Sequence, residues 1–161
     1  MTAYHIFTLL LVSLAMALSM AHALEFPGKL RLSRDAYLTV QPIYYPGFTF
    51  GGFVGELGGM VALILLLILV PFASPQFWWV AAAFAFLLAA HLTYWLVTHP
   101  VNGFWLKDAD LGALGGRFFS AFSQSQTKDW TRLRDVWEYS HVARAVLSML
   151  SLIAIAASLT V

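Results

Sequence analysis

The chain has 161 residues, of which 60% are hydrophobic and 11% are charged, and its formal net charge is +1. Soluble domains carry about a quarter charged residues, so this composition excludes an ordinary soluble domain and is typical of an integral membrane protein. The sequence has no cysteine, which excludes disulfides, thiolate metal sites and thiol redox chemistry, and no basic tract that would bind nucleic acid. We therefore expect a single all-α transmembrane domain over residues 1–161.

Four segments are apolar and long enough to cross a bilayer, which takes about 20 residues for about 30 Å of hydrocarbon. They cover approximately residues 4–24, 52–72, 77–98 and 138–160. The first segment also resembles a signal peptide, because Ala21-His22-Ala23 has the small-x-small form of a cleavage site. Residues 1–5 contain no Lys or Arg, however, so we interpret this segment as a retained helix.

The basic residues are distributed asymmetrically between the two sides that four spans create. All nine fall in residues 25–50, in residues 99–137 or at an adjoining helix end: Lys29, Arg31, Arg34, Lys107, Arg117, Lys128, Arg132, Arg134 and Arg144. The positive-inside rule then places both long connections in the cytoplasm and both termini outside. The sequence thus predicts a four-helix bundle that runs up, down, up and down through the membrane.

The connections carry their own patterns. In residues 25–50, Ser33 can cap a short amphipathic helix at the membrane interface, which Pro42 and Pro46 would end. The residues of this helix at 3/4 spacing are Tyr37, Val40, Gln41 and Tyr44. A tight turn near residues 73–76 makes the second and third spans antiparallel neighbours. The glycine-rich run LGALGGRFFSAFSQSQTK fits a short interfacial helix or a loop equally well.

Three glycines recur every four residues in the second span: Gly51, Gly55 and Gly59. Small residues at this spacing let another helix approach closely. We expect this face of the second span to pack against a neighbouring helix.

The last span enters the membrane with polar residues on one face. On a helix they lie within an arc of about 120°: Arg134, Trp137, Glu138, His141, Arg144 and Ser148. Lipid cannot satisfy these groups, so the stripe should point into the bundle. The other helices carry polar or aromatic residues near the same depth: His22, Glu25, Tyr44, Glu56, His91, Tyr94 and Asn102. We expect both sets to converge in one cytoplasm-facing pocket, of the kind that binds small molecules between bundle helices.

Several interpretations of this cluster stay open. The charged groups could simply pair, for instance Arg134 with Glu138 at i, i+4. Glu138-x-x-His141 also has the spacing of ligands in di-iron bundles, and His22-x-x-Glu25 has the reverse order. A haem between His91 and His141 is a further alternative.

We favour a site that uses neither metal nor organic cofactor. In it, His141 or His91, tuned by Glu138 or Glu56, removes a phenolic or activated C–H proton from a small apolar or aromatic ligand. Arg144 stabilises the oxyanion that results. The remaining polar residues would bind the substrate.

Several stretches together resemble the DUF1772 family of small four-helix membrane proteins, which includes the anthrone oxygenases. These stretches are AHALEFPGK (21–29), IYYPG (43–47), PVN (100–102) and DWTRLRDVWEYSH (129–141). The resemblance implies oxidation of an anthrone to an anthraquinone by molecular oxygen without a cofactor. Asn102, Arg134, Trp137 and His141 are the positions that match the shared pattern.

The forms of the first and last stretches resemble a bacterial branch of that family, most of whose members lack an assigned activity, which implies a bacterial inner membrane. The alternative to an enzyme is an accessory subunit or scaffold in a homo-oligomer or larger membrane complex. An accessory subunit should present an apolar or small-residue face to another protein, and the glycine ladder is a candidate for it. An enzyme should have an open cavity that reaches His141, Arg144 and Glu56, without a buried pair that neutralises its charges.

Overall fold

Helices make up every regular element of the computed structural model in the ranges that it describes, residues 2–106, 111–120 and 129–161. In these ranges four helices are long and apolar enough to cross a membrane, as the sequence predicts. They are α1 (Thr2–Lys29), a second helix made of α3 (Gly47–Gly52), η2 (Phe53–Leu57) and α4 (Gly58–Leu69), a third made of α5 (Pro75–Thr93), η3 (Tyr94–Thr98) and α6 (His99–Leu106), and α8 (Trp130–Ala157).

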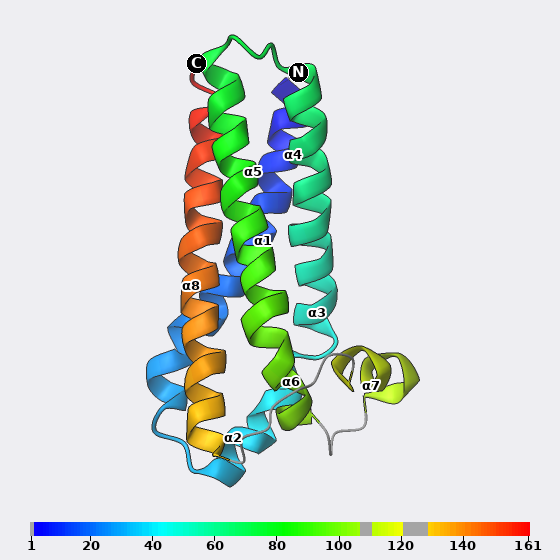
Figure 1. Ribbon diagram of the computed structural model, residues 1–161, viewed down its shortest axis with the longest axis vertical. Coiled ribbons are helices and arrows are strands. Elements are labelled where there is room, and N and C mark those ends of the chain that lie inside the picture. Colours follow the sequence, from blue (N-terminus) through cyan, green and yellow to red (C-terminus); the bar gives the residue numbers. More distant parts are fainter. Residues whose placement is uncertain (1, 107–110, 121–128) are drawn as a thin grey trace.

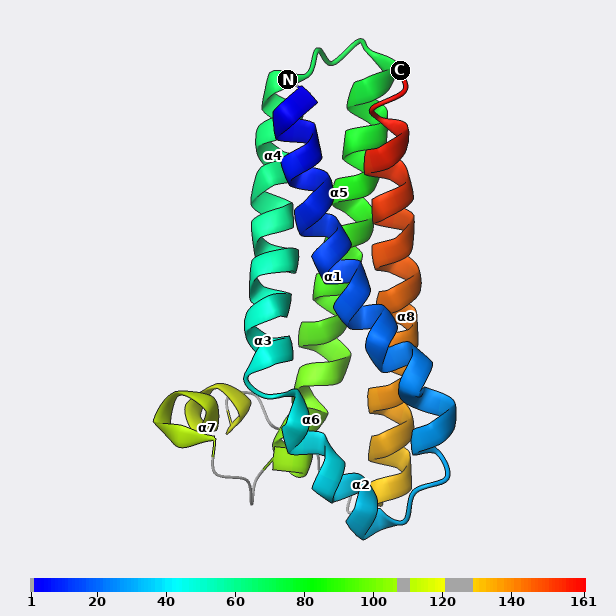
Figure 2. The same cartoon turned by 180° about the vertical axis from the view of Figure 1, so that it is seen from behind.

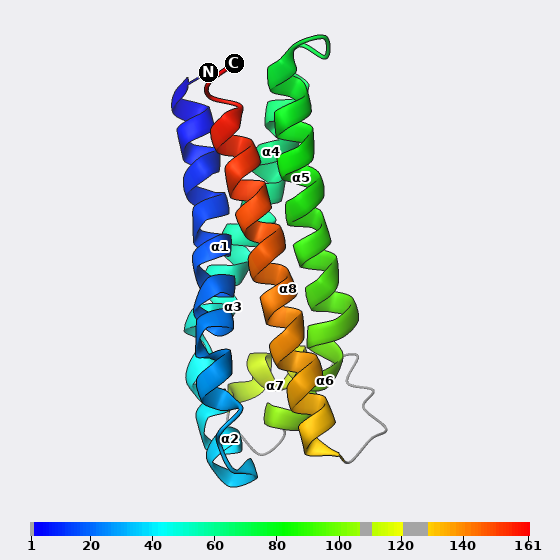
Figure 3. The same cartoon turned by 90° about the vertical axis from the view of Figure 1, so that its left-hand side faces the viewer.

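The four long helices lie side by side (Figure 1). Both termini and the turn between α4 and α5 lie at one end of the bundle, here called the terminus end. The short helix α2 (Arg34–Val40), α6 and α7 (Gly112–Ser120) lie at the other, the α2 end, where α7 projects to one side (Figure 2). Viewed from the side, α8 lies between α1 and α5 (Figure 3), and it packs closely against both.

The long helices extend beyond the predicted spans at the α2 end. α1 continues past residue 24 to Lys29, with Pro27 inside it, and the third helix continues past residue 98 to Leu106. α8 begins at Trp130, because the carboxylate of Asp129 caps it by accepting from the backbone N–H of Thr131 at 3.0 Å. Hydropathy identifies only the apolar part of a helix, so the spans predicted from it left out the polar turns at the helix ends. His141 therefore lies three turns inside α8 rather than at its start.

The short helix predicted after Ser33 is present. The Ser33 hydroxyl accepts from the backbone N–H of Ala36, α2 ends at Val40, and a 3₁₀ turn, η1 (Gln41–Tyr44), follows it. The glycine-rich run forms α7 over Gly112–Ser120, and the part of the run at 121–128 lies outside the described residues.

The glycine ladder packs against α1, as predicted. A Cβ atom built on Gly55 would lie 2.6 Å from the backbone nitrogen of Ala15, and one on Gly51 would lie 2.8 Å from Leu18 Cδ1. Only glycine allows the two helices to approach this closely. Because α1 already covers this face, the ladder is not a surface for another protein.

Candidate functional site

A cavity of about 270 Å³ opens among the long helices toward the α2 end. Most of the predicted site residues line it: His22, Tyr44, Glu56, His91, Tyr94, Asn102, Trp137, His141 and Arg144. Glu25, Arg134 and Glu138 do not line it, so the expectation that all these groups share one pocket is wrong for those three. The structure separates the polar residues into a cavity set and a second cluster around Lys29.

Two segments of π-helix flank the cavity at facing positions of the second and third long helices. η2 carries Glu56 and η3 carries Tyr94 and Trp95, all of which line the cavity. A π-helical turn widens the helix by one residue and is frequent at functional sites. Sequence periodicity does not reveal such a turn, because the residue types on either side of it are those of an ordinary apolar helix.

A chain of hydrogen bonds runs across the cavity through Glu56. Arg144 donates to one oxygen of Glu56, and His91 Nδ1 lies 3.0 Å from the other. The indole N–H of Trp95 donates to His91 Nε2 at 2.9 Å. Because an indole nitrogen can only donate, His91 Nε2 must be the acceptor and Nδ1 must carry the proton that goes to Glu56.

His91 is therefore a neutral ring whose only lone pair is already engaged by Trp95. This arrangement argues against His91 as a base and leaves His141 as the candidate. Glu56 and Arg144 are 4% and 8% exposed and form a buried ion pair. The cavity expected of an enzyme is thus present, and so is the buried pair expected of a structural cluster.

His141 and His22 face each other inside the cavity, with ring centroids 4.2 Å apart. His141 Nδ1 lies 2.9 Å from the backbone carbonyl of Trp137, which can only accept, so this nitrogen carries a proton. The Trp137 ring lies 3.9 Å from that of His141 and donates from its own N–H to Asn102 Oδ1 at 2.7 Å. Within the described ranges, His22 Nδ1 is buried without a hydrogen-bond partner.

A second polar cluster surrounds Lys29, which is 4% exposed. Its ammonium lies 3.0 Å from Glu25 and 3.7 Å from Glu138, and 4.5 and 4.6 Å from the ring centroids of Tyr44 and Trp137. From the sequence, Lys29 was expected only as a charge on the cytoplasmic side. Its position four residues after Glu25 on α1 was the sequence signal for an ion pair between the two side chains.

Two tyrosines outside the spanning segments hold the carboxylates of this cluster. Tyr37 donates to Glu138 Oε1 at 2.8 Å, and Tyr44 donates to Glu25. Burial, followed by the charge of Glu138, raises the pKa of Tyr37. Burial, followed by the hydrogen bond to Glu25, raises the pKa of Tyr44. Both phenols therefore stay protonated donors at any ordinary pH.

Arg134 belongs to neither set. Its guanidinium donates to Asp135 at 2.8 Å and lies 5.3 Å from the Trp130 ring centroid. The predicted pair of Arg134 with Glu138 is therefore wrong, because Lys29 from α1 occupies the carboxylate instead.

Gln41 and Trp105 are two of the cavity residues that were not predicted as site residues. Gln41 and Trp105 are both 4% exposed and line the cavity, and in the described ranges their side-chain nitrogens have no hydrogen-bond partner. Gln41 belongs to the 3/4 pattern of the first connection, which was the only sequence signal for it. No comparable pattern marks Trp105.

The carboxylates that could serve as metal ligands lie in different clusters. Glu56 is engaged by Arg144 and His91, whereas Glu138 is engaged by Lys29 and Tyr37. In the part of the chain that the structure describes, no group of three or more His, Asp or Glu side chains is arranged to hold a metal ion.

Comparisons with known proteins give no relative from which the site could be interpreted. A scan against models of protein families found no match to this chain, and neither did searches of curated proteins and of solved structures.

Proposed function

We propose that the chain is an integral membrane protein whose cavity binds a small apolar or aromatic molecule. The four helices would run up, down, up and down, with the α2 end in the cytoplasm, α2 at the interface and the cavity facing the cytoplasmic half of the bilayer. The position of the basic residues supports this orientation, since Lys29, Arg34 and Arg134 all lie at or near the α2 end. More than half of the residues that line the cavity are aromatic or apolar, and polar side chains from several helices converge among them, as in small-molecule sites.

The observation that carries a chemical role is the hydrogen bond from His141 to the Trp137 carbonyl. In a neutral imidazole that donates from Nδ1, the lone pair lies on Nε2 and can accept a proton from a ligand. His141 is 3% exposed, so its lone pair is shielded from bulk water. Arg144 lines the same cavity and can stabilise an oxyanion, with Glu56 holding its guanidinium in place.

The reaction that fits these groups is a cofactor-independent oxygenation, as the resemblance to the anthrone oxygenases implies. His141 would remove a proton from an activated CH₂ group that lies between two aromatic rings and is conjugated through them with a ketone. The enolate then reduces O₂, a C–O bond forms, and the returned proton gives a hydroperoxide. Loss of one water leaves a carbonyl, so that CH₂ and O₂ become C=O and H₂O.

A non-enzymatic role as an accessory subunit is the second candidate, and the buried Glu56–Arg144 pair favours it. In that case the pair has a purely structural role and holds α8 against η2. The glycine ladder does not support this alternative, because α1 covers it.

Binding of 1-naphthol and turnover of anthrone by the protein in lipid nanodiscs test the proposal. Wild type should bind 1-naphthol saturably and take up oxygen with anthrone. His141→Gln should lose turnover, whereas the matched variant His5→Gln, which changes another buried histidine far from the cavity, should keep it. Absence of saturable binding above empty nanodiscs, or full turnover by His141→Gln, would overturn the proposal.

A further inference from the structure

The second and third long helices separate from each other toward the α2 end. Near the terminus end α4 packs against α5, but in the described part of the chain no comparable packing joins α3 or η2 to η3 or α6. The cavity is lined from both sides of this separation, by Gly52 and Glu56 on one helix and by His91 and Trp95 on the other. A side of the cavity therefore lies where these two helices do not pack against each other, and the hydrogen bond between His91 and Glu56 spans the separation.

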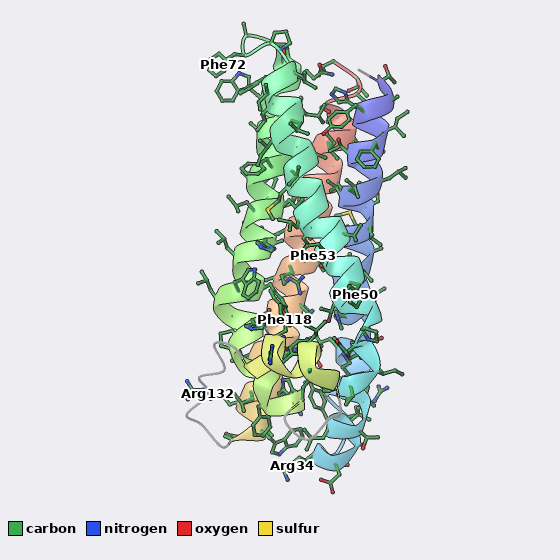
Figure 4. All side chains as sticks on the ribbon, turned by 90° about the vertical axis from the view of Figure 1, so that its right-hand side faces the viewer. Arg34, Phe50, Phe53, Phe72, Phe118 and Arg132 are labelled. Atoms are coloured by element: carbon green, nitrogen blue, oxygen red, sulfur yellow. The ribbon has the colours of Figure 1, made fainter. Side chains whose placement is uncertain are left out.

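The exposed residues of the cavity lining lie along this separation. Phe53 and Leu57, both on η2, are 64% and 38% exposed and line the cavity as well. Gly52 precedes them, and a Cβ atom built there would meet nothing within 4 Å. Figure 4 shows the labelled Phe53 and Phe50 on the second helix, with Phe118 on α7 below them.

This opening lies within an apolar span. Phe53 is the seventh residue of the span Gly47–Leu69, about 9 Å along its axis. Its neighbours Phe50 and Val54 are 64% and 50% exposed, a surface that suits lipid rather than water.

Buried side chains line the cavity toward the α2 end. Trp105 and Trp137 line it and pack in one cluster with Tyr37 and Leu133, all of them at most 4% exposed. On the α7 side, the ring of Phe118 lies 5.9 Å from that of Trp95. A molecule that entered between these rings would have to displace them, whereas one from the bilayer would pass a glycine and the edges of Phe53 and Leu57.

We propose that the ligand reaches the cavity sideways from the bilayer, between η2 and η3, past Gly52, Phe53 and Leu57. The ligand is then an uncharged, lipid-soluble molecule that dissolves in hydrocarbon and meets polar groups only inside. This inference rests on the proposed function for the existence of a ligand, but the opening can be tested without one.

The test uses the absence of cysteine from the chain. Ser19 is 2% exposed and lines the cavity, so Ser19→Cys places a single thiol inside it. In proteoliposomes, uncharged N-phenylmaleimide should label this thiol, by addition of sulfur and proton across its C=C bond, and a sulfonated maleimide should not. Adding Gly52→Leu should slow labelling about tenfold, and adding Phe53→Ala should speed it.

Gly47→Leu is the matched control, because Gly47 lies on the same helix, has equally open space at its Cβ and does not line the cavity. Equal labelling rates in the Gly52→Leu and Gly47→Leu backgrounds would overturn the inference. Labelling by the sulfonated reagent would overturn it too, as would a Ser19→Cys thiol that reacts only after denaturation. If labelling follows Gly52 while wild type fails to bind 1-naphthol, the opening stands and the proposed function fails.

Discussion

The two ends of the bundle are built from the same four helices, but one has an apolar, closely packed interior and the other has a polar interior with a cavity. At the terminus end, Val12, Leu63, Leu66, Leu87 and Ile155 fill the interior and are fully buried. At the α2 end, the interior holds the Lys29–Glu138 and Glu56–Arg144 ion pairs, several histidines and a cavity. Polar groups are costly in hydrocarbon, so a protein that needed only four packed helices would have an apolar interior at both ends. The polar half is therefore where function should be sought.

Among the predicted changes, removal of the Glu56 carboxylate from the polar half should have the largest effect on the free energy of unfolding. Glu56→Ala leaves the Arg144 guanidinium buried and unpaired and should lower the free energy of unfolding by about 3–5 kcal/mol. Thermal unfolding in detergent micelles measures it. Glu25→Ala is the control, because Glu25 is half exposed and its loss should cost under about 1 kcal/mol. Equal effects of the two variants would show that Arg144 finds another acceptor.

The close approach of α1 to η2 lies between the two halves and should give the next largest effect. In Gly55→Ala the new methyl group collides with the backbone at Ala15, so we expect a loss of about 1–3 kcal/mol. Gly52→Ala, where a Cβ has open space, should change stability little in the same unfolding assay. If Gly55→Ala unfolds like wild type, the glycine ladder is not what sets the distance between these helices.

The smallest effect concerns Asp129, the exposed cap of α8 at the α2 end. The hydrogen bond from the Thr131 hydroxyl, followed by the Arg132 backbone N–H, lowers the pKa of Asp129. A lowered pKa in the folded state means that its stabilisation is present above the ordinary aspartate range near about pH 4 and is lost as the pH falls through the folded value. Wild type should thus lose a little stability in acid. Asp129→Asn should lack this component, and an unchanged acid profile in that variant would rule out the cap as its source.

The sequence predicted the four long helices, the cap at Ser33 and the inward polar stripe, because hydrophobic runs and helical periodicity depend only on residue order. For the same reason Glu56, His141 and Arg144 were expected at one pocket, and all three line the cavity. Pairing between helices depends on their exact rotation, which residue order does not give. The sequence could not show that Lys29 rather than Arg134 meets Glu138, or that η2 and η3 are π-helical.

Solid-state nitrogen NMR of His141 in lipid bilayers tests most directly whether the cavity is a ligand site. We predict a neutral ring with its proton on Nδ1, and a shift of the Nε2 signal on addition of 1-naphthol, as that nitrogen accepts a hydrogen bond. The signals of His5 at the terminus end should not move. A His141 spectrum that stays unchanged at saturating 1-naphthol would contradict a ligand role for the polar half of the bundle.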